Sequence, residues 1–83
     1  MLMWSTVSED RRSVMIARET DAAVTLEPLL HAVSSNREYL LAAPTEDVWW
    51  VVLEIDGHPS KSSYFPSKDA AKDRAEEWEI GFR

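Results

Sequence analysis

The segment 48–78 limits the possible folds of this chain more than any other part of the sequence. Residues 48–55 are almost all β-branched or aromatic, and such side chains pack well on a pleated sheet. Residues 56–59, Asp-Gly-His-Pro, are typical of a turn, because glycine accepts a positive φ and proline cannot continue a central strand. The segment therefore predicts a strand, a turn, a returning strand at 62–65 and a helix that begins after Ser67.

The C-terminal helix has clear start and stop signals. Ser67 is a good N-cap, Asp69 favours the positive end of the helix dipole, and Gly81 is expected to end the helix. One apolar face follows at helical spacing and contains Ala71, Ala75, Trp78 and Phe82. This face is expected to pack closely on the sheet because alanine side chains are small.

An earlier helix is predicted to begin at Thr25. Thr25 can cap it, Pro28 is tolerated in a first turn, and an apolar face follows at Leu26, Leu29, Leu30 and Val33. This helix either stops at residues 34–36 or runs on until Pro44.

The first twenty residues allow two interpretations. Segments 2–7 and 12–18 could form a hairpin around a turn at 8–11, or Ser8 could cap a helix through Val14, Met15 and Ala17. We favour the hairpin. The fold expected for the single domain 1–83 is then α+β, with two helices packed on an antiparallel sheet of three or four strands, in hairpin-helix-hairpin-helix order.

Alternation within the strand 48–55 separates two faces of the sheet. Trp49, Val51, Leu53 and Ile55 are expected to pack under the helices, while Trp50, Val52 and Tyr64 lie on the other face. That aromatic face is either an exposed binding surface or a second core covered by the first helix or by the N-terminal segment.

Charge and composition narrow the possible partners. Fifteen acidic and nine basic residues give a net charge of −6, which disfavours binding to nucleic acid phosphates or to an anionic membrane. An acidic surface can instead meet a basic protein surface and accelerate that encounter. The chain has no cysteine, no basic leader and no apolar run long enough to cross a bilayer, so we expect a cytoplasmic protein.

No catalytic, metal or cofactor site is expected. The two histidines, His31 and His58, are too few for a zinc site, and the serines lack a glycine-flanked elbow. Only two glycines are present, so a loop that cradles phosphate is absent as well.

The expected binding site combines aromatic anchors with carboxylates. Its residues are Trp50, Tyr64, Glu54, Asp56, Asp69, Asp73 and Glu76. Three bases on the same helix, Lys68, Lys72 and Arg74, are expected to dilute the field of the helix carboxylates.

Four short motifs carry a resemblance to known proteins: Trp49-x-Val51, Asp56-Gly57, the run 64–72 (Tyr-Phe-Pro-Ser-Lys-Asp-Ala-Ala-Lys) and the run 75–78 (Ala-Glu-Glu-Trp). Together they resemble a pattern found in small phage and plasmid proteins, including some anti-CRISPR proteins. The resemblance implies a small acidic protein without enzymatic motifs that binds the surface of a nucleic-acid-handling complex. It assigns a role to no individual residue.

The sequence thus predicts a non-enzymatic inhibitor that occludes a basic, nucleic-acid-handling surface of a host defence complex. The alternative is a scaffold subunit that forms a homodimer through its aromatic sheet face. A third class is an enzyme or metal protein built around His31 and His58, which elemental analysis of metal content and a His58→Ala variant would test.

Overall fold

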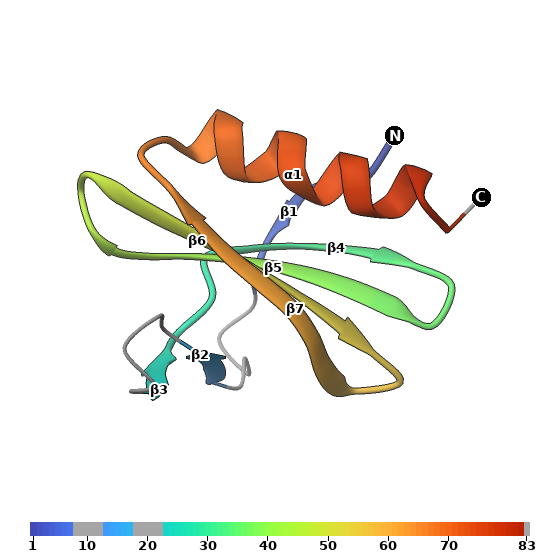
Figure 1. Ribbon diagram of the computed structural model, residues 1–83, viewed down its shortest axis with the longest axis horizontal. Helices are drawn as coiled ribbons and strands as arrows, with labels where there is room; N and C mark the ends of the chain where they lie inside the picture. Colours follow the sequence, from blue (N-terminus) through green and yellow to red (C-terminus); the bar gives the residue numbers. More distant parts are fainter. Residues whose placement is uncertain (8–12, 18–22, 83) are drawn as a thin grey trace.

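The computed structural model describes residues 1–7, 13–17 and 23–82. Within these residues the chain forms seven strands and one helix (Figure 1). In chain order they are β1 (Ser5–Thr6), β2 (Val14–Ala17), β3 (Ala23–Leu26), β4 (Leu30–Ser34), β5 (Arg37–Thr45), β6 (Val48–Ile55), β7 (His58–Phe65) and α1 (Lys68–Ile80).

The main sheet is antiparallel and has the strand order β1-β4-β5-β6-β7. Strands β4 to β7 follow one another in a meander, joined by two-residue turns at 35–36, 46–47 and 56–57. Asp56 and Gly57 both have positive φ, 53° and 82°, as a type I′ hairpin turn requires. Ser35 also has a positive φ of 58° in the first of these turns.

Helix α1 covers one face of the main sheet (Figure 1). Its buried Ala71 and Ala75 lie in a core with Leu2 and with alternate residues of the central strands: Ala32, Tyr39, Leu41, Val51 and Leu53. Trp49 and Ile55 pack at the edge of this core. The prediction that the face of β6 with Trp49, Val51, Leu53 and Ile55 packs under a helix is confirmed.

Strands β2 and β3 form a separate hairpin on the opposite face of the sheet (Figure 1). A second core lies between the two sheets and contains Val14, Ile16, Leu40, Trp50 and Val52. The Trp50 face is therefore covered by the N-terminal segment, which is one of the two alternatives that the sequence allowed. The domain has three layers: helix, sheet and hairpin.

The expectation of two helices on three or four strands is wrong. Among the described residues there is one helix, and seven strands form a five-stranded and a two-stranded sheet. The helix predicted from Thr25 consists instead of β3, a connection through Pro28, and β4. Its apolar face belongs to no single surface, since Leu26 packs in the hairpin core, Leu30 packs in the helix core, and Leu29 and Val33 are exposed.

The helix prediction beyond Val33 is wrong for a different reason. Residues 34–36, interpreted as a weak part or end of a helix, include the tight turn between β4 and β5. In β5 the residues from Tyr39 to Ala42 are all buried, because the strand is covered on both faces. A strand of this kind loses its polar-apolar alternation and resembles a buried helix in sequence.

The N-terminal hairpin expected from segments 2–7 and 12–18 is also wrong in its pairing. Strands form in both segments, but β1 pairs with β4 and β2 pairs with β3. The alternative helix through Val14, Met15 and Ala17 is excluded because these residues belong to β2. The predicted turn at 8–11 lies outside the described residues. The hairpin of β6 and β7 and the C-terminal helix, by contrast, are confirmed.

Candidate functional site: the acidic face of α1

The surface with the most distinct chemistry is the outer side of α1. The helix begins where the Ser67 hydroxyl accepts a hydrogen bond from the backbone N–H of Ala70 at 3.2 Å, as expected for an N-cap. Because Ala71 and Ala75 face the sheet, the residues about half a turn away point outward. The outward residues are Asp69 and Asp73, and Glu76 and Glu77 lie one on each side of them; we call these four residues the acidic ridge.

The members of the acidic ridge differ in how they are held. Asp69, Asp73 and Glu77 are exposed, whereas Glu76 is half-buried and its Oε1 accepts a hydrogen bond of 2.7 Å from the backbone N–H of Leu2. Asp69 and Asp73 form no ion pair with any other described residue. They lie one helical turn apart, a spacing at which Cβ atoms are about 5–6 Å from each other, and their carboxylates remain available to a partner.

The bases of α1 lie against aromatic rings at the two sides of the helix. The Lys68 ammonium is 6.0 Å from the centre of the Trp49 ring, and the Lys72 ammonium is 5.9 Å from the Trp4 ring. Both distances lie within the range of a cation–π interaction. The long side chains therefore run down toward the sheet, away from the acidic ridge.

Arg74 follows the same arrangement beside β7. Its guanidinium is 5.6 Å from the centre of the Phe65 ring, and its Nε is 3.4 Å from a carboxylate oxygen of Glu77. The sequence predicted that bases on this helix would dilute the acidic field. The structure places these cations at the flanks, where Arg74 pairs with Glu77, so Asp69 and Asp73 dominate the outermost line of the helix.

A second polar group lies beneath the last turn of α1, and we call it the Glu79 cluster. Glu79 is only 2% exposed, and its carboxylate receives hydrogen bonds from Arg37 Nε at 2.9 Å, Arg37 Nη2 at 3.1 Å and Tyr39 Oη at 2.8 Å. The Ser34 hydroxyl donates a further, short hydrogen bond to it. Phe82 completes the cluster, with its ring centre 4.6 Å from the Arg37 guanidinium.

The electrostatics of the Glu79 cluster favour the ionised carboxylate. The hydrogen bonds from Arg37 lower the pKa of Glu79 to about 2 against the opposing effect of burial, with Ser34 and Tyr39 contributing in the same direction as Arg37. Burial, followed by the hydrogen bond to Glu79, raises the pKa of Tyr39. A carboxylate with so low a pKa is a poor general base near neutral pH, so the cluster acts as a clamp that fixes the end of α1 to β4 and β5.

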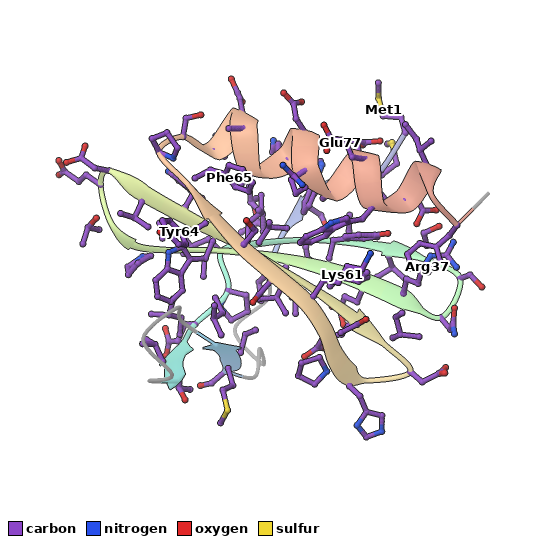
Figure 2. All side chains as sticks on the ribbon, viewed as in Figure 1. Met1, Arg37, Lys61, Tyr64, Phe65 and Glu77 are labelled. Carbon is purple, nitrogen blue, oxygen red and sulfur yellow. The ribbon has the colours of Figure 1, made fainter. Side chains whose placement is uncertain are left out.

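The predicted aromatic anchors lie in different environments. Trp50 is 7% exposed and sits in the hairpin core, while Tyr64, its direct partner across β6 and β7, is 55% exposed. Figure 2 shows Tyr64 on the side of β7 away from α1 and Phe65 on the side toward it. Tyr64 thus remains accessible, whereas Trp50 offers little surface to a partner.

The predicted carboxylates are likewise divided. Glu54 is 3% exposed and faces the hairpin side of the sheet, where it is the direct cross-strand partner of Glu38. Asp56 is exposed in the β6–β7 turn and accepts a hydrogen bond of 3.2 Å from the Asn36 amide. Asp69, Asp73 and Glu76 lie together on α1. The structure therefore brings together three of the seven predicted residues and separates them from the other four.

Sequence reasoning missed Glu77 and the Glu79 cluster. A signal for the cluster was present, because Glu79 continues the apolar stripe through Ala71 and Ala75 at a spacing of four residues. A carboxylate in an apolar stripe requires a buried cation or several donors. Arg37 and Tyr39, two positions apart on one strand, supply both.

The histidines do not form a metal site with the other described residues. His31 Nδ1 lies 3.4 Å from a carboxylate oxygen of Glu38, and His58 begins β7. Across residues 1–7, 13–17 and 23–82, no cluster of three or more His, Cys, Asp or Glu side chains could hold a metal ion. In the same residues, no helix has the length and apolar character needed to cross a bilayer.

Comparison of the chain with protein-family models, with curated proteins and with solved structures gave no significant match.

Proposed function

We propose that this protein acts by binding a basic surface of another protein through the acidic ridge of α1. The observation that carries the proposal is the separation of charge on the helix: Asp69 and Asp73 project outward, while the three bases of the helix lie on aromatic rings at its sides. A rigid helix presents Asp69 and Asp73 without the entropy cost of ordering a loop.

Electrostatics would act mainly on the rate of encounter. A cluster of carboxylates attracts a basic patch over a Debye length, and the net charge of −6 adds to this attraction. Complementary charge raises an association rate far more than it raises the affinity of individual surface ion pairs.

The kind of partner that we propose is a nucleic-acid-handling effector of a host defence complex, whose basic groove the ridge would occlude. Such grooves concentrate Lys and Arg to contact phosphates, and carboxylates on a helix can occupy the same positions. This proposal agrees with the resemblance to small phage proteins of the anti-CRISPR type. It also places the protein in the cytoplasm, which suits a chain without cysteine.

The test begins with a pull-down from the native host and identification of the bound protein by mass spectrometry. Association rates with the purified partner are then measured at low and at physiological salt. The variant Asp69→Asn/Asp73→Asn is expected to slow association by about tenfold at low salt and to reduce its salt dependence.

A matched control is available in the β5–β6 turn, where Glu46 and Asp47 are exposed and connect two strands of the sheet instead of lying on α1. Glu46→Gln/Asp47→Asn removes the same two charges and is expected to change the rate less than about twofold at low salt. Equal effects of the two double variants, or an association rate insensitive to salt, would contradict the role of the ridge.

The alternative of a homodimer through the aromatic sheet face would require displacement of β2 and β3. These strands cover Trp50 and Val52, both of which are buried. We therefore do not place an interface on that face.

A further inference from the structure

Strand β7 forms one edge of the main sheet. In the described part of the chain it pairs with β6 on one side only. All of its residues are exposed except Ser63 and Phe65, which are half-buried. A long edge strand offers unpaired backbone N–H and C=O groups to another strand, so natural proteins protect such edges.

The protection of β7 is confined to its first half. Pro59 removes one backbone donor, and the register with β6 shifts between Leu53 and Glu54, so that Ser60 is skipped in the pairing. Prolines and bulges of this kind discourage the addition of a strand. The second half, residues 62–65, has no proline, no bulge and no charge.

The unprotected half is complementary to itself in one antiparallel register. When two copies of β7 pair about Ser63, Ser62 of each copy faces Tyr64 of the other, and Lys61 of each faces Phe65 of the other. Because cross-strand partners share a sheet face, Lys61 and Phe65 meet on the helix side. A lysine on an edge strand normally opposes pairing. Here, however, the Lys61 ammonium of one copy would lie against the Phe65 ring of the other, and in each copy that ring also contacts the Arg74 guanidinium.

The flank of α1 above β7 adds a second complementarity. Arg74 and Glu77 lie on this flank, as the contact between Arg74 and the Phe65 ring shows. Figure 2 shows Glu77 on the helix above the sheet edge that carries Phe65 and Lys61. A twofold axis between the Ser63 residues of the two copies would make the two helices antiparallel neighbours, so that Arg74 of one copy faces Glu77 of the other in both directions.

We propose that a second copy of this chain binds along residues 61–65 of β7 and joins the two five-stranded sheets into one continuous antiparallel sheet. Backbone hydrogen bonds between the β7 strands hold the two copies together, and the reciprocal Arg74–Glu77 pairs fix the register. Both acidic ridges then lie on the same face of the dimer. This inference depends on β7 and goes beyond the proposed function, because the acidic ridge is present in a monomer and needs no dimer to bind a partner.

The first experiment measures molar mass by sedimentation over a wide range of protein concentration. The wild type is expected to show a reversible dimer. Arg74→Glu places a carboxylate opposite Glu77 of the other copy at both symmetric contacts. It is expected to weaken the dimer by about tenfold or more. The exchanged variant Arg74→Glu/Glu77→Arg restores the pairs and is expected to recover dimerisation.

Lys72→Glu serves as the matched control, because Lys72 lies on the other flank of α1 against Trp4. It introduces the same change of charge and is expected to leave the dimer within about twofold of the wild type. All three variants carry substitutions on α1, and their thermal unfolding midpoints verify that each one is folded.

The second experiment locates the interface by amide hydrogen exchange. Protection of amides in residues 61–65 is expected to rise with protein concentration. Three results would each overturn the inference: a monomer at every concentration, a dimer that Arg74→Glu does not weaken, or β7 amides protected only when a different protein is added.

Discussion

The Glu79 cluster allows a quantitative prediction of how stability depends on pH. Glu79 is nearly inaccessible and its pKa falls from an ordinary value of 4.5 to about 2. A group with a depressed folded-state pKa stabilises the fold above its unfolded pKa, and that stabilisation is lost as the pH falls through the folded value. The cluster therefore contributes fully at neutral pH and progressively less between about pH 4.5 and pH 2.

The size of the contribution follows from the shift. Each unit of pKa corresponds to 1.36 kcal/mol, so a decrease of this size corresponds to about 3 kcal/mol in the free energy of unfolding. For a chain of 83 residues this is a large part of the total stability, which is about 4–12 kcal/mol at typical values per residue.

The perturbation is Glu79→Gln, which keeps the shape of the side chain and removes its charge. We expect a loss of about 3 kcal/mol at pH 7, and we expect the stabilities of variant and wild type to converge as the pH falls to about 2. Urea unfolding followed by tryptophan fluorescence measures both quantities at constant ionic strength.

Glu77→Gln is the matched control, because the same substitution is made two positions away on the exposed side of the helix. Its effect is expected to stay within about 0.5 kcal/mol. A loss of less than about 1 kcal/mol for Glu79→Gln, or a loss that does not change with pH, would refute the argument from the buried ion pair.

Two further predictions concern the hairpin core and the β6–β7 turn. Trp50→Ala is expected to cost about 3–5 kcal/mol in urea unfolding, because the ring is buried between two sheets; a cost below 1 kcal/mol would mean that β2 and β3 do not cover it. Gly57→Ala is expected to lower stability by about 1–2 kcal/mol through the positive φ alone, since an added Cβ would meet no atom within 4 Å. Asp56→Gly in the same turn is expected to lower it by less than about 1 kcal/mol, because relief of the positive φ offsets the loss of the hydrogen bond from Asn36. Equal losses in both turn variants would contradict this explanation.

Local signals predicted the C-terminal half of the fold well. The β6–β7 hairpin follows from a run of β-branched and aromatic residues and from Asp56-Gly57, and α1 follows from Ser67 and its alanine face. Each of these signals acts over a few neighbouring residues, so no knowledge of the rest of the chain was needed.

The first half could not be predicted in the same way, because its strands are defined by distant partners. The pairing of β1 with β4 joins residues that are about 25 positions apart, and β5 is covered on both faces by segments from opposite ends of the chain. An apolar spacing that fits a helix arose from two strands that contribute to different cores. Sequence periodicity cannot distinguish these cases when both faces of a strand are buried.

The candidate site was predicted only in part, because some of its features also depend on segments that are distant in the sequence. The helix carboxylates lie together because a single local element positions them, and Trp50 was placed on the correct face of its strand. Whether that face was open depended on β2 and β3, which pack on it from far away in the sequence. The direction of the lysine and arginine side chains on α1 depended on the rings of Trp4, Trp49 and Phe65, none of which lies on the helix.

The three tight turns between β4 and β7 also bear on how the chain reaches its native state. Each turn brings successive strands together over a short loop, so the central meander can assemble stepwise with little entropy lost in closing each loop. The bonds from Arg37 and Tyr39 to Glu79 span 42 and 40 residues, and they can form only after the sheet and helix are in place. The last turn of α1 should therefore contribute mainly to the rate of unfolding and little to the rate of folding.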